Sequence, residues 1–95
     1  MQEISLEATA TGGRYFIADG SDDEAEMTFS RASATLVIVD HTHVPDRCRG
    51  QGVGLRLAER VIADARAKGF RILPLCPFMR AQFAKHPEWH DVLSQ

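Results

Sequence analysis

The chain has few cysteines, no long apolar run and almost no net charge. Its 95 residues include only two cysteines, Cys48 and Cys76, too few for a disulfide-stabilised secreted domain. No stretch approaches the ~20 apolar residues that a membrane span requires, and no signal-type apolar segment follows Met1. A net charge of −2 lacks the basic excess of a nucleic-acid binder. We therefore expect a cytoplasmic protein with reduced cysteines that binds neither membranes nor nucleic acids.

The common metal-binding motifs are missing too. The chain contains four histidines but no C-x-x-C pair. The segment His86-Pro-Glu-Trp-His90 does not match H-E-x-x-H, because Pro87 stands at the position of the glutamate. The acidic turn between Asp19 and Glu24 lacks the terminal bidentate glutamate of a calcium loop. We predict no metal site.

What the chain does contain is typical of a globular domain. It has 44% hydrophobic and 25% charged residues, and its length favours a single domain over residues 1–95. Alternating apolar and polar residues predict strands at 14–19 and 24–31, joined as a hairpin by the acidic turn. Residues 3–9 are expected to add an edge strand.

The strongest predicted strand covers residues 34–44. Its first half is apolar on both faces, as in a central strand, and its second half is polar. Simple alternation places His41 and His43 on one face, and Asp40 and Thr42 on the other. A strand that changes from apolar to polar along its length indicates a functional site at the polar end.

The second half of the chain reads as helix, strand and helix. Residues 52–68 carry an apolar stripe flanked by Leu55 and Leu57, and Gly69 is expected to end this helix in a left-handed conformation. A strand at 70–76, a helix at 77–85 and a short helical turn at 87–93 follow. The order predicts an α/β (α+β) fold with a right-handed, parallel β-α-β unit and a C-terminal helix.

The segment Arg49-Gly-Gln-Gly-Val-Gly54 opens the first predicted helix. Its glycines let the backbone turn tightly, and the unpaired N–H groups of a helix start attract anions. A dinucleotide fingerprint would need glycine where Leu55 stands, and a P-loop would need Gly-Lys-Ser/Thr after its spacer. The segment is therefore either a tight loop that only caps the helix or a cradle for a pyrophosphate. Around it, residues 46–60 carry four arginines against two acidic residues.

This glycine segment matches the R/Q-x-x-G-x-G/A acetyl-CoA signature of the GCN5-related N-acetyltransferase (GNAT) superfamily. His41-Thr-His-Val-Pro45, Pro74-Leu-Cys-Pro-Phe78 and His86-Pro-Glu-Trp89 flank it in the same order as in the small, single-domain subgroup of that superfamily, which it resembles. The resemblance covers residues 14–93. It implies a minimal GNAT-like fold with a central mixed, mostly antiparallel sheet.

The resemblance also implies a mode of binding acetyl-CoA, or coenzyme A. Backbone amides from Cys48 to Gly54 would hold the pyrophosphate, and the pantetheine arm would lie in a split between the strands that end at Val44 and Cys76. The cofactor-binding residues expected from this are Val44, Arg49, Gly50, Gln51, Gly52, Val53 and Gly54. The acceptor would be an unidentified amine on a protein, a polyamine or a small molecule, and the protein a monomer or a weak homodimer.

Two residues are candidates for catalysis. An amine with a pKa near ~10.4 must lose a proton before it attacks a thioester, and His41, with an ordinary pKa of ~6.5, is the best-matched base. Cys76 has three interpretations: a buried small apolar residue, a thiol that lines the thioester pocket, or a nucleophile that relays the acetyl group. The main hypothesis is an acetyl-CoA-dependent N-acetyltransferase, and the alternative is a non-catalytic module that binds or senses CoA.

Overall fold

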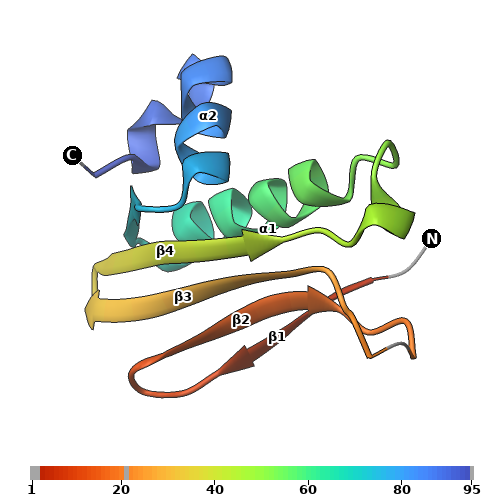
Figure 1. Cartoon of the computed structure of the whole chain (residues 1–95). Coiled ribbons are helices and arrows are strands. Elements are labelled where there is room, and N and C mark those ends of the chain that lie inside the picture. The colour runs from red at the N-terminus through yellow and green to blue at the C-terminus, as the bar shows by residue number, and fades with distance from the viewer. Residues whose placement is uncertain (1–2, 21, 95) are drawn as a thin grey trace.

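The computed structural model describes residues 3–20 and 22–94 (Figure 1). Its strands form one sheet in sequence order, and only the last pair is parallel. In chain order the elements are β1 (Ile4–Ala8), β2 (Gly12–Ile17), β3 (Glu26–Ser33), β4 (Leu36–His43), the 3-10 turn η1 (Asp46–Cys48), α1 (Val53–Lys68), β5 (Arg71–Pro74), α2 (Pro77–Lys85) and the 3-10 turn η2 (Pro87–Val92).

The predicted mixed, mostly antiparallel sheet is confirmed, and so is the edge strand near the N-terminus. Each strand of the β2–β3 hairpin is displaced by two residues from its predicted position, β2 toward the N-terminus and β3 toward the C-terminus. β2 ends at Ile17, whose amide donates to the carbonyl of Ala25 at 3.0 Å, so Asp19 lies beyond the ladder. Ser21 of the predicted acidic turn lies outside the described residues.

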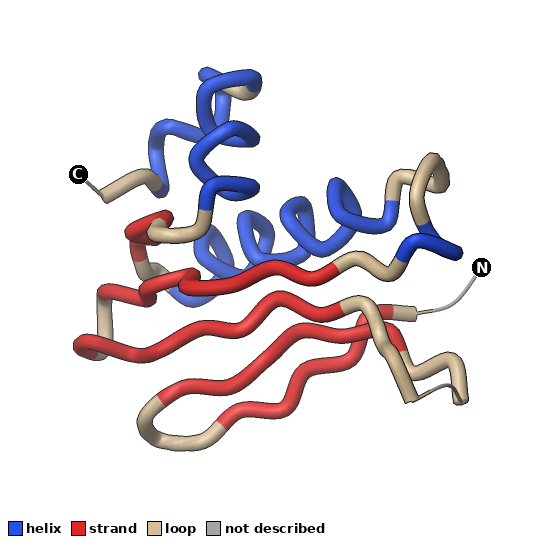
Figure 2. The backbone as a smooth tube through the Cα atoms, in the orientation of Figure 1, coloured by secondary structure: helices blue, strands red, loops and turns tan. Residues whose placement is uncertain are grey.

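α1 connects β4 to β5 and packs on one face of the sheet, and Figure 2 shows the helices grouped on one side of the strands. The predicted apolar stripe of the helix is buried, with Ala58 and Val61 fully enclosed. Of the two residues predicted to flank this stripe, Leu57 is fully buried and Leu55 is 37% exposed. Gly69 ends α1 with a φ of 77°, which confirms the predicted left-handed cap.

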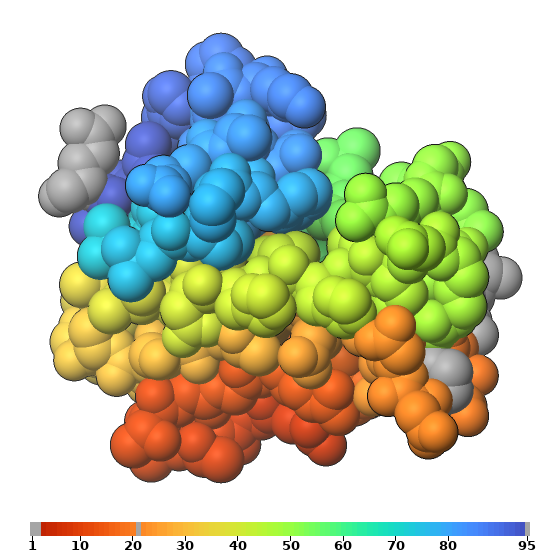
Figure 3. All heavy atoms as spheres, in the orientation of Figure 1, coloured from red at the N-terminus to blue at the C-terminus, as the bar shows by residue number. Residues whose placement is uncertain are grey.

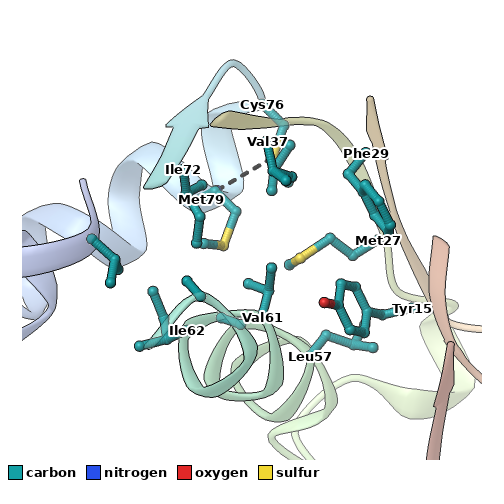
Figure 4. Packing of buried hydrophobic residues seen from close by; sticks show 14 of the residues in the cluster. Tyr15, Met27, Phe29, Val37, Leu57, Val61, Ile62, Ile72, Cys76 and Met79 are labelled. Atoms are coloured by element: carbon teal, nitrogen blue, oxygen red, sulfur yellow. Dashed lines mark hydrogen bonds between the residues drawn. The ribbon is translucent and has the colours of Figure 1, made fainter. Parts of the chain in front are cut away.

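The hydrophobic core lies between α1, α2 and the inner face of the sheet (Figure 4). Its largest fully buried side chains include Met27 from β3, Leu57 from α1, Ile72 from β5 and Met79 from α2. Because Val37 and Val39 of β4 are buried in the same core, the core fixes where the polar end of β4 lies relative to both helices. None of the described helices is long and apolar enough to cross a membrane.

Residues 93 and 94 lie beside β5, at the edge of the sheet. Leu93 forms a parallel bridge with Ile72, and the amide of Ser94 donates to the Ile72 carbonyl at 2.8 Å. Trp89 of η2 is buried and meets the ring of Phe83 edge to face, with 6.4 Å between ring centroids. The predicted helical turn at 87–93 is thus a 3-10 turn that covers the end of α2.

Candidate functional site

A β-bulge interrupts β4 at Asp40. Val39 lies opposite Phe29 of β3, and the next pair joins His41 to Thr28. β4 therefore has one residue more than β3 at this point, and that residue is Asp40. An extra residue on one strand changes which of the following side chains point to which face of the sheet.

The bulge turns Thr42 toward the core face. Thr42 lies opposite the fully buried Met27, and cross-strand partners share a face. Its Oγ1 is 3.4 Å from the Sγ of Cys76. The two candidates for catalysis, His41 and Cys76, therefore do not lie together. His41 is exposed on the other face of the sheet, which it shares with the half-buried His43, because simple alternation does not continue through a bulge.

Beyond the bulge, β4 separates from β5. Their parallel pairing ends at Val39 and Pro74, and the amides of Leu75 and Cys76 both donate to the carbonyl of Val39, at 2.9 and 3.2 Å. From Asp40 onward, β4 keeps its ladder with β3 but pairs with no second strand among the described residues. The strands thus form a split at their carboxyl ends, where ligands bind in open α/β sheets.

A cleft of about 480 Å³ extends from this split to the start of α1. Figure 3 shows the surface hollowed between α2, in blue, and the green loop before α1. The volume lies in the usual range for a cofactor site. The lining residues come from β4, the loop, and both helices: Thr42, Val44, Cys48, Arg49, Gly50, Gly52, Val53, Gly54, Leu55, Phe78 and Gln82.

The glycine loop leaves backbone donors open at one end of this cleft. Gly50 and Gly52 have φ angles of 81° and 72°, in the left-handed region that glycine adopts without strain. The first intrahelical bond of α1 runs from the amide of Arg56 to the Gly52 carbonyl. Five amides before that of Arg56 have no hydrogen-bond acceptor among the described residues. They belong to Gly50, Gly52, Val53, Gly54 and Leu55.

This set of donors differs in part from the predicted one. The amides of Cys48, Arg49 and Gln51 bond to carbonyls within the loop, at 2.9, 3.1 and 3.3 Å, so they shape the turn. The first turn of α1 carries no acidic side chain and Gly52 offers no side-chain cap. A helix start with unbonded amides and no nearby carboxylate in its first turn favours an anion.

At Gly54 a glycine is required for a steric reason and not for its backbone conformation. Its φ angle is ordinary, but a Cβ atom there would lie 2.7 Å from the Cζ atom of Phe78 and 3.5 Å from a methyl carbon of Val44. The glycine lets the start of α1 approach the first turn of α2. Phe78 and Val44 thereby form an apolar middle section of the cleft, between the loop and Thr42.

Two predicted cofactor-binding side chains have partners inside the loop. Arg49 lies beside the cleft with its side chain 73% exposed, and its Nε is 2.8 Å from an Asp46 carboxylate oxygen. Gln51 faces a neighbouring hollow of about 400 Å³ instead of the cleft, and its Nε2 donates to the Arg47 carbonyl at 3.3 Å. The side chain of Gln51 therefore supports the turn, whereas Val53 lines both spaces.

An ion pair ties this loop to the hairpin of β2 and β3. The guanidinium of Arg47 donates to Asp19 at 2.5 Å, and this bond raises the pKa of Arg47. Asp19 is mostly buried, with its side chain 15% exposed. The contact links the end of β2 to the loop that shapes the site.

Cys76 caps the second helix. Its Sγ accepts a hydrogen bond from the amide of Met79 at 3.4 Å, drawn as the dashed line in Figure 4, and Pro77 occupies the first helical position. The side chain is 5% exposed and does not line the cleft. Cys76 and Cys48 are both free thiols, as predicted. Among the described residues, no three histidine, cysteine, aspartate or glutamate side chains lie close enough to hold a metal ion.

Sequence reasoning missed four residues that line the cleft: Thr42, Leu55, Phe78 and Gln82. Phe78 ends the Pro74-Leu-Cys-Pro-Phe78 motif, which supports the family resemblance but assigns no role to the ring. Gln82 lies one helical turn beyond it on α2, a spacing that places the two residues on one face. No sequence signal marks Thr42, because its orientation depends on the bulge.

Comparisons with known proteins agree with this architecture. The family model of the GCN5-related N-acetyltransferases matches residues 14–92. The structure is similar to that of a GCN5-like protein from Staphylococcus aureus, determined in solution by NMR, with 27% sequence identity and a TM-score of 0.76. The match covers 99% of this chain and 91% of the other. A search of curated proteins finds no significant match. Since the family model spans the split strands, the glycine loop and both helices, the chain belongs to the GCN5-related N-acetyltransferase family.

Proposed function

We propose that the protein is an acetyl-CoA-dependent N-acetyltransferase. The observation that carries the proposal is the continuity of the cleft. It begins at the open amides of α1, passes the apolar section around Phe78, and ends at Thr42 beside the split of the sheet. An elongated ligand with an anionic head and a reactive tail fits such a path, and acetyl-CoA has this form.

The residues present suit each part of that ligand. The amides of Gly50, Gly52, Val53, Gly54 and Leu55 bind the pyrophosphate, helped by the positive end of the α1 dipole. Val44 and Phe78 pack against the pantetheine arm. The edge of β4 beyond Val39 offers backbone groups to the amides of that arm, because β5 no longer pairs there. When bound, acetyl-CoA supplies an activated acetyl thioester at the Thr42 end.

The acceptor amine approaches from the other face of the sheet. His41 is exposed there, on the strand that borders the split. In the transfer, the nitrogen lone pair bonds to the thioester carbonyl carbon, the carbon–sulfur bond breaks, and the thiolate of CoA takes a proton. His41 serves as the base that first removes the proton from the amine. Cys76 contributes at the thioester end, through its contact with Thr42.

One observation favours a second candidate, a CoA-binding module without turnover. His41 and the cleft lie on opposite faces of β4, so catalysis requires the acceptor to reach the thioester through the split. A protein that only binds the cofactor needs the cleft and the open amides but has no use for His41. The two functions therefore differ in whether this side chain matters.

A thiol-release assay with acetyl-CoA and a panel of amines tests the proposal. We expect release of CoA that depends on the acceptor and falls about 10²- to 10⁴-fold in His41→Ala, the usual contribution of a general base. His43→Ala is the matched control, because His43 lies two residues away on the same face and is held by Asp23 at 2.7 Å. It should retain activity within about threefold, as a side chain outside the reaction would.

Binding is measured separately from release, by thermal shift with acetyl-CoA. Binding without acceptor-dependent release would establish the module instead of the enzyme. Equal rates for the wild type and His41→Ala would remove His41 from the mechanism while leaving the enzyme in place. Absence of any ligand-induced stabilisation would contradict both functions.

A further inference from the structure

The inner end of the cleft is formed by Thr42, and this residue has no role yet in the proposed function. Cys76 is buried behind it and does not line the cleft, so a ligand in the cleft meets the threonine and not the sulfur. The two side chains are in contact, with Oγ1 and Sγ 3.4 Å apart. The β-bulge at Asp40 is what turns Thr42 into this position.

The hydrogen bonds of Cys76 determine whether the hydroxyl of Thr42 can donate a hydrogen bond to a ligand. The sulfur already accepts from the amide of Met79, which occupies one of its lone pairs. Among the described residues, the Thr42 oxygen is also the one acceptor paired with the Cys76 thiol, which favours an arrangement in which the thiol hydrogen is donated to Thr42. The hydroxyl hydrogen of Thr42 then has no acceptor among the described residues and is available to a group in the cleft.

We propose that Thr42 donates a hydrogen bond to the carbonyl oxygen of the acetyl thioester and that Cys76 acts as the positioning residue that holds its hydroxyl. This inference rests on the proposed function and extends it. A donor fixed at the oxygen where negative charge develops stabilises the transition state more than the ground state. Thr42 is thus a catalytic residue, and the burial of Cys76 follows from its supporting role.

The position along β4 agrees with this assignment. Val44, the first residue after β4, lies beside the apolar section of the cleft, and Thr42 lies two residues farther from the glycine loop. Two residues of extended chain span about 6.6 Å. A pantetheine arm that enters past Val44 therefore carries its terminal thioester toward Thr42.

Three variants separate a catalytic role from a structural one. Thr42→Val removes the hydroxyl and keeps the shape, Thr42→Ser keeps the hydroxyl, and Cys76→Ala removes the group that holds it. We expect kcat to fall about 10²- to 10³-fold in Thr42→Val, the range found for loss of one oxyanion donor, with the KM for acetyl-CoA changed less than about threefold. Thr42→Ser should restore most of the rate, and Cys76→Ala should show an intermediate loss.

A second measurement does not depend on turnover. The protein is mixed with acetyl-CoA labelled with carbon-13 at the carbonyl, without acceptor, and the NMR shift of the bound carbonyl is recorded. A hydrogen bond to the oxygen moves this signal downfield, so Thr42→Val should move it upfield relative to the wild type and to Thr42→Ser.

The outcomes distinguish this inference from the proposed function. If acetyl-CoA binds the wild type and the carbonyl signal is the same in Thr42→Val, the role of Thr42 is overturned while cofactor binding stands. If acetyl-CoA does not bind the wild type at all, the proposed function fails and the inference fails with it. A loss of kcat that Thr42→Ser does not restore would assign the effect to packing and would also overturn the inference.

Discussion

The two helices of this protein begin in opposite ways. α1 starts at Gly52 with no side-chain cap, and its first amides have no acceptor among the described residues. α2 starts at Cys76, whose sulfur accepts from the amide of Met79 and whose carbonyl accepts from the amide of Arg80 at 3.2 Å. Both helix starts border the same cleft, but the first leaves more donors for a ligand, because at the second only the amide of Phe78 lacks an acceptor among the described residues.

This difference separates function from stability within one small fold. Unbonded amides at a helix start are a cost that native proteins usually avoid by capping. Their retention at α1, next to a cleft, is explained by a bound anion that accepts hydrogen bonds from them. At α2 the sulfur of Cys76 and the proline at the first position meet most of the same need inside the protein, so this end contributes stability, and its side chains Phe78 and Gln82 shape the cleft.

The largest expected effect comes from altering the start of α1. Gly52→Val places a β-branched residue at a φ of 72°, a conformation that such residues strongly disfavour. Acetyl-CoA at one hundred times its Kd should stabilise the wild type by about 2.7 kcal/mol, or roughly 10–20 °C in Tm. We expect thermal scans of Gly52→Val to lose most of this ligand-induced shift.

Gly69→Val is the matched control for that experiment. Gly69 has a φ of 77° and ends the same helix, and a Cβ atom added there would have no neighbour within 4 Å, as is also the case at Gly52. Both variants should lower the Tm of the free protein, but Gly69→Val should keep the acetyl-CoA shift. Loss of the shift in both would mean that general strain, not the cleft, accounts for the result.

An intermediate effect is expected at the start of α2. Cys76→Ala removes the side-chain acceptor for the Met79 amide, and loss of such a cap costs about 1 kcal/mol. For a domain of this size the Tm should fall by roughly 4–8 °C. Cys76→Ser keeps an acceptor and should stay closer to the wild type. Equal Tm values for all three proteins would contradict the capping role.

The smallest effect concerns acid stability at the C-terminal end. The guanidinium of Arg66 on α1 bonds to both carboxylate oxygens of Asp91, at 2.9 and 3.0 Å, and lowers the pKa of that exposed carboxyl. A lowered pKa in the folded state contributes stability above the ordinary value near ~4, and this contribution is lost as the pH falls through the folded value.

Asp91→Asn should therefore be slightly less stable than the wild type at neutral pH, with the difference shrinking below about pH 4. Tm values measured across this range test the prediction. Because Asp91 does not line the cleft, the acetyl-CoA shift should be the same in both proteins. A difference that grows in acid would have the wrong sign for this ion pair.

Much of the fold follows from local patterns in the sequence. The buried stripe of α1, its glycine end at Gly69 and the proline at the start of α2 each have a direct physical signature, and each lies at its predicted position. The parallel pairing of β4 with β5 follows from the strand, helix, strand order. These features depend on neighbouring residues, so one sequence is sufficient to find them.

The orientation of the site residues could not be predicted in the same way. In β4 the apolar pair Val37 and Val39 fixes the inner face, but the polar residues after Val39 contain no apolar side chain that would show a change of register. The bulge at Asp40 is set by pairing with β3, a contact between strands. Alternation alone therefore assigns His41 to the face that Thr42 occupies.

The most direct test of the open helix start is an NMR titration of the nitrogen-15-labelled protein with CoA. We predict that the largest backbone amide shifts belong to Gly50, Gly52, Val53 and Gly54, whose donors are open, while the amide of Met79, already bonded to Cys76, shifts little. If the amides at the start of α1 did not move and the largest shifts lay at the start of α2 or outside the cleft, the central claim would be contradicted.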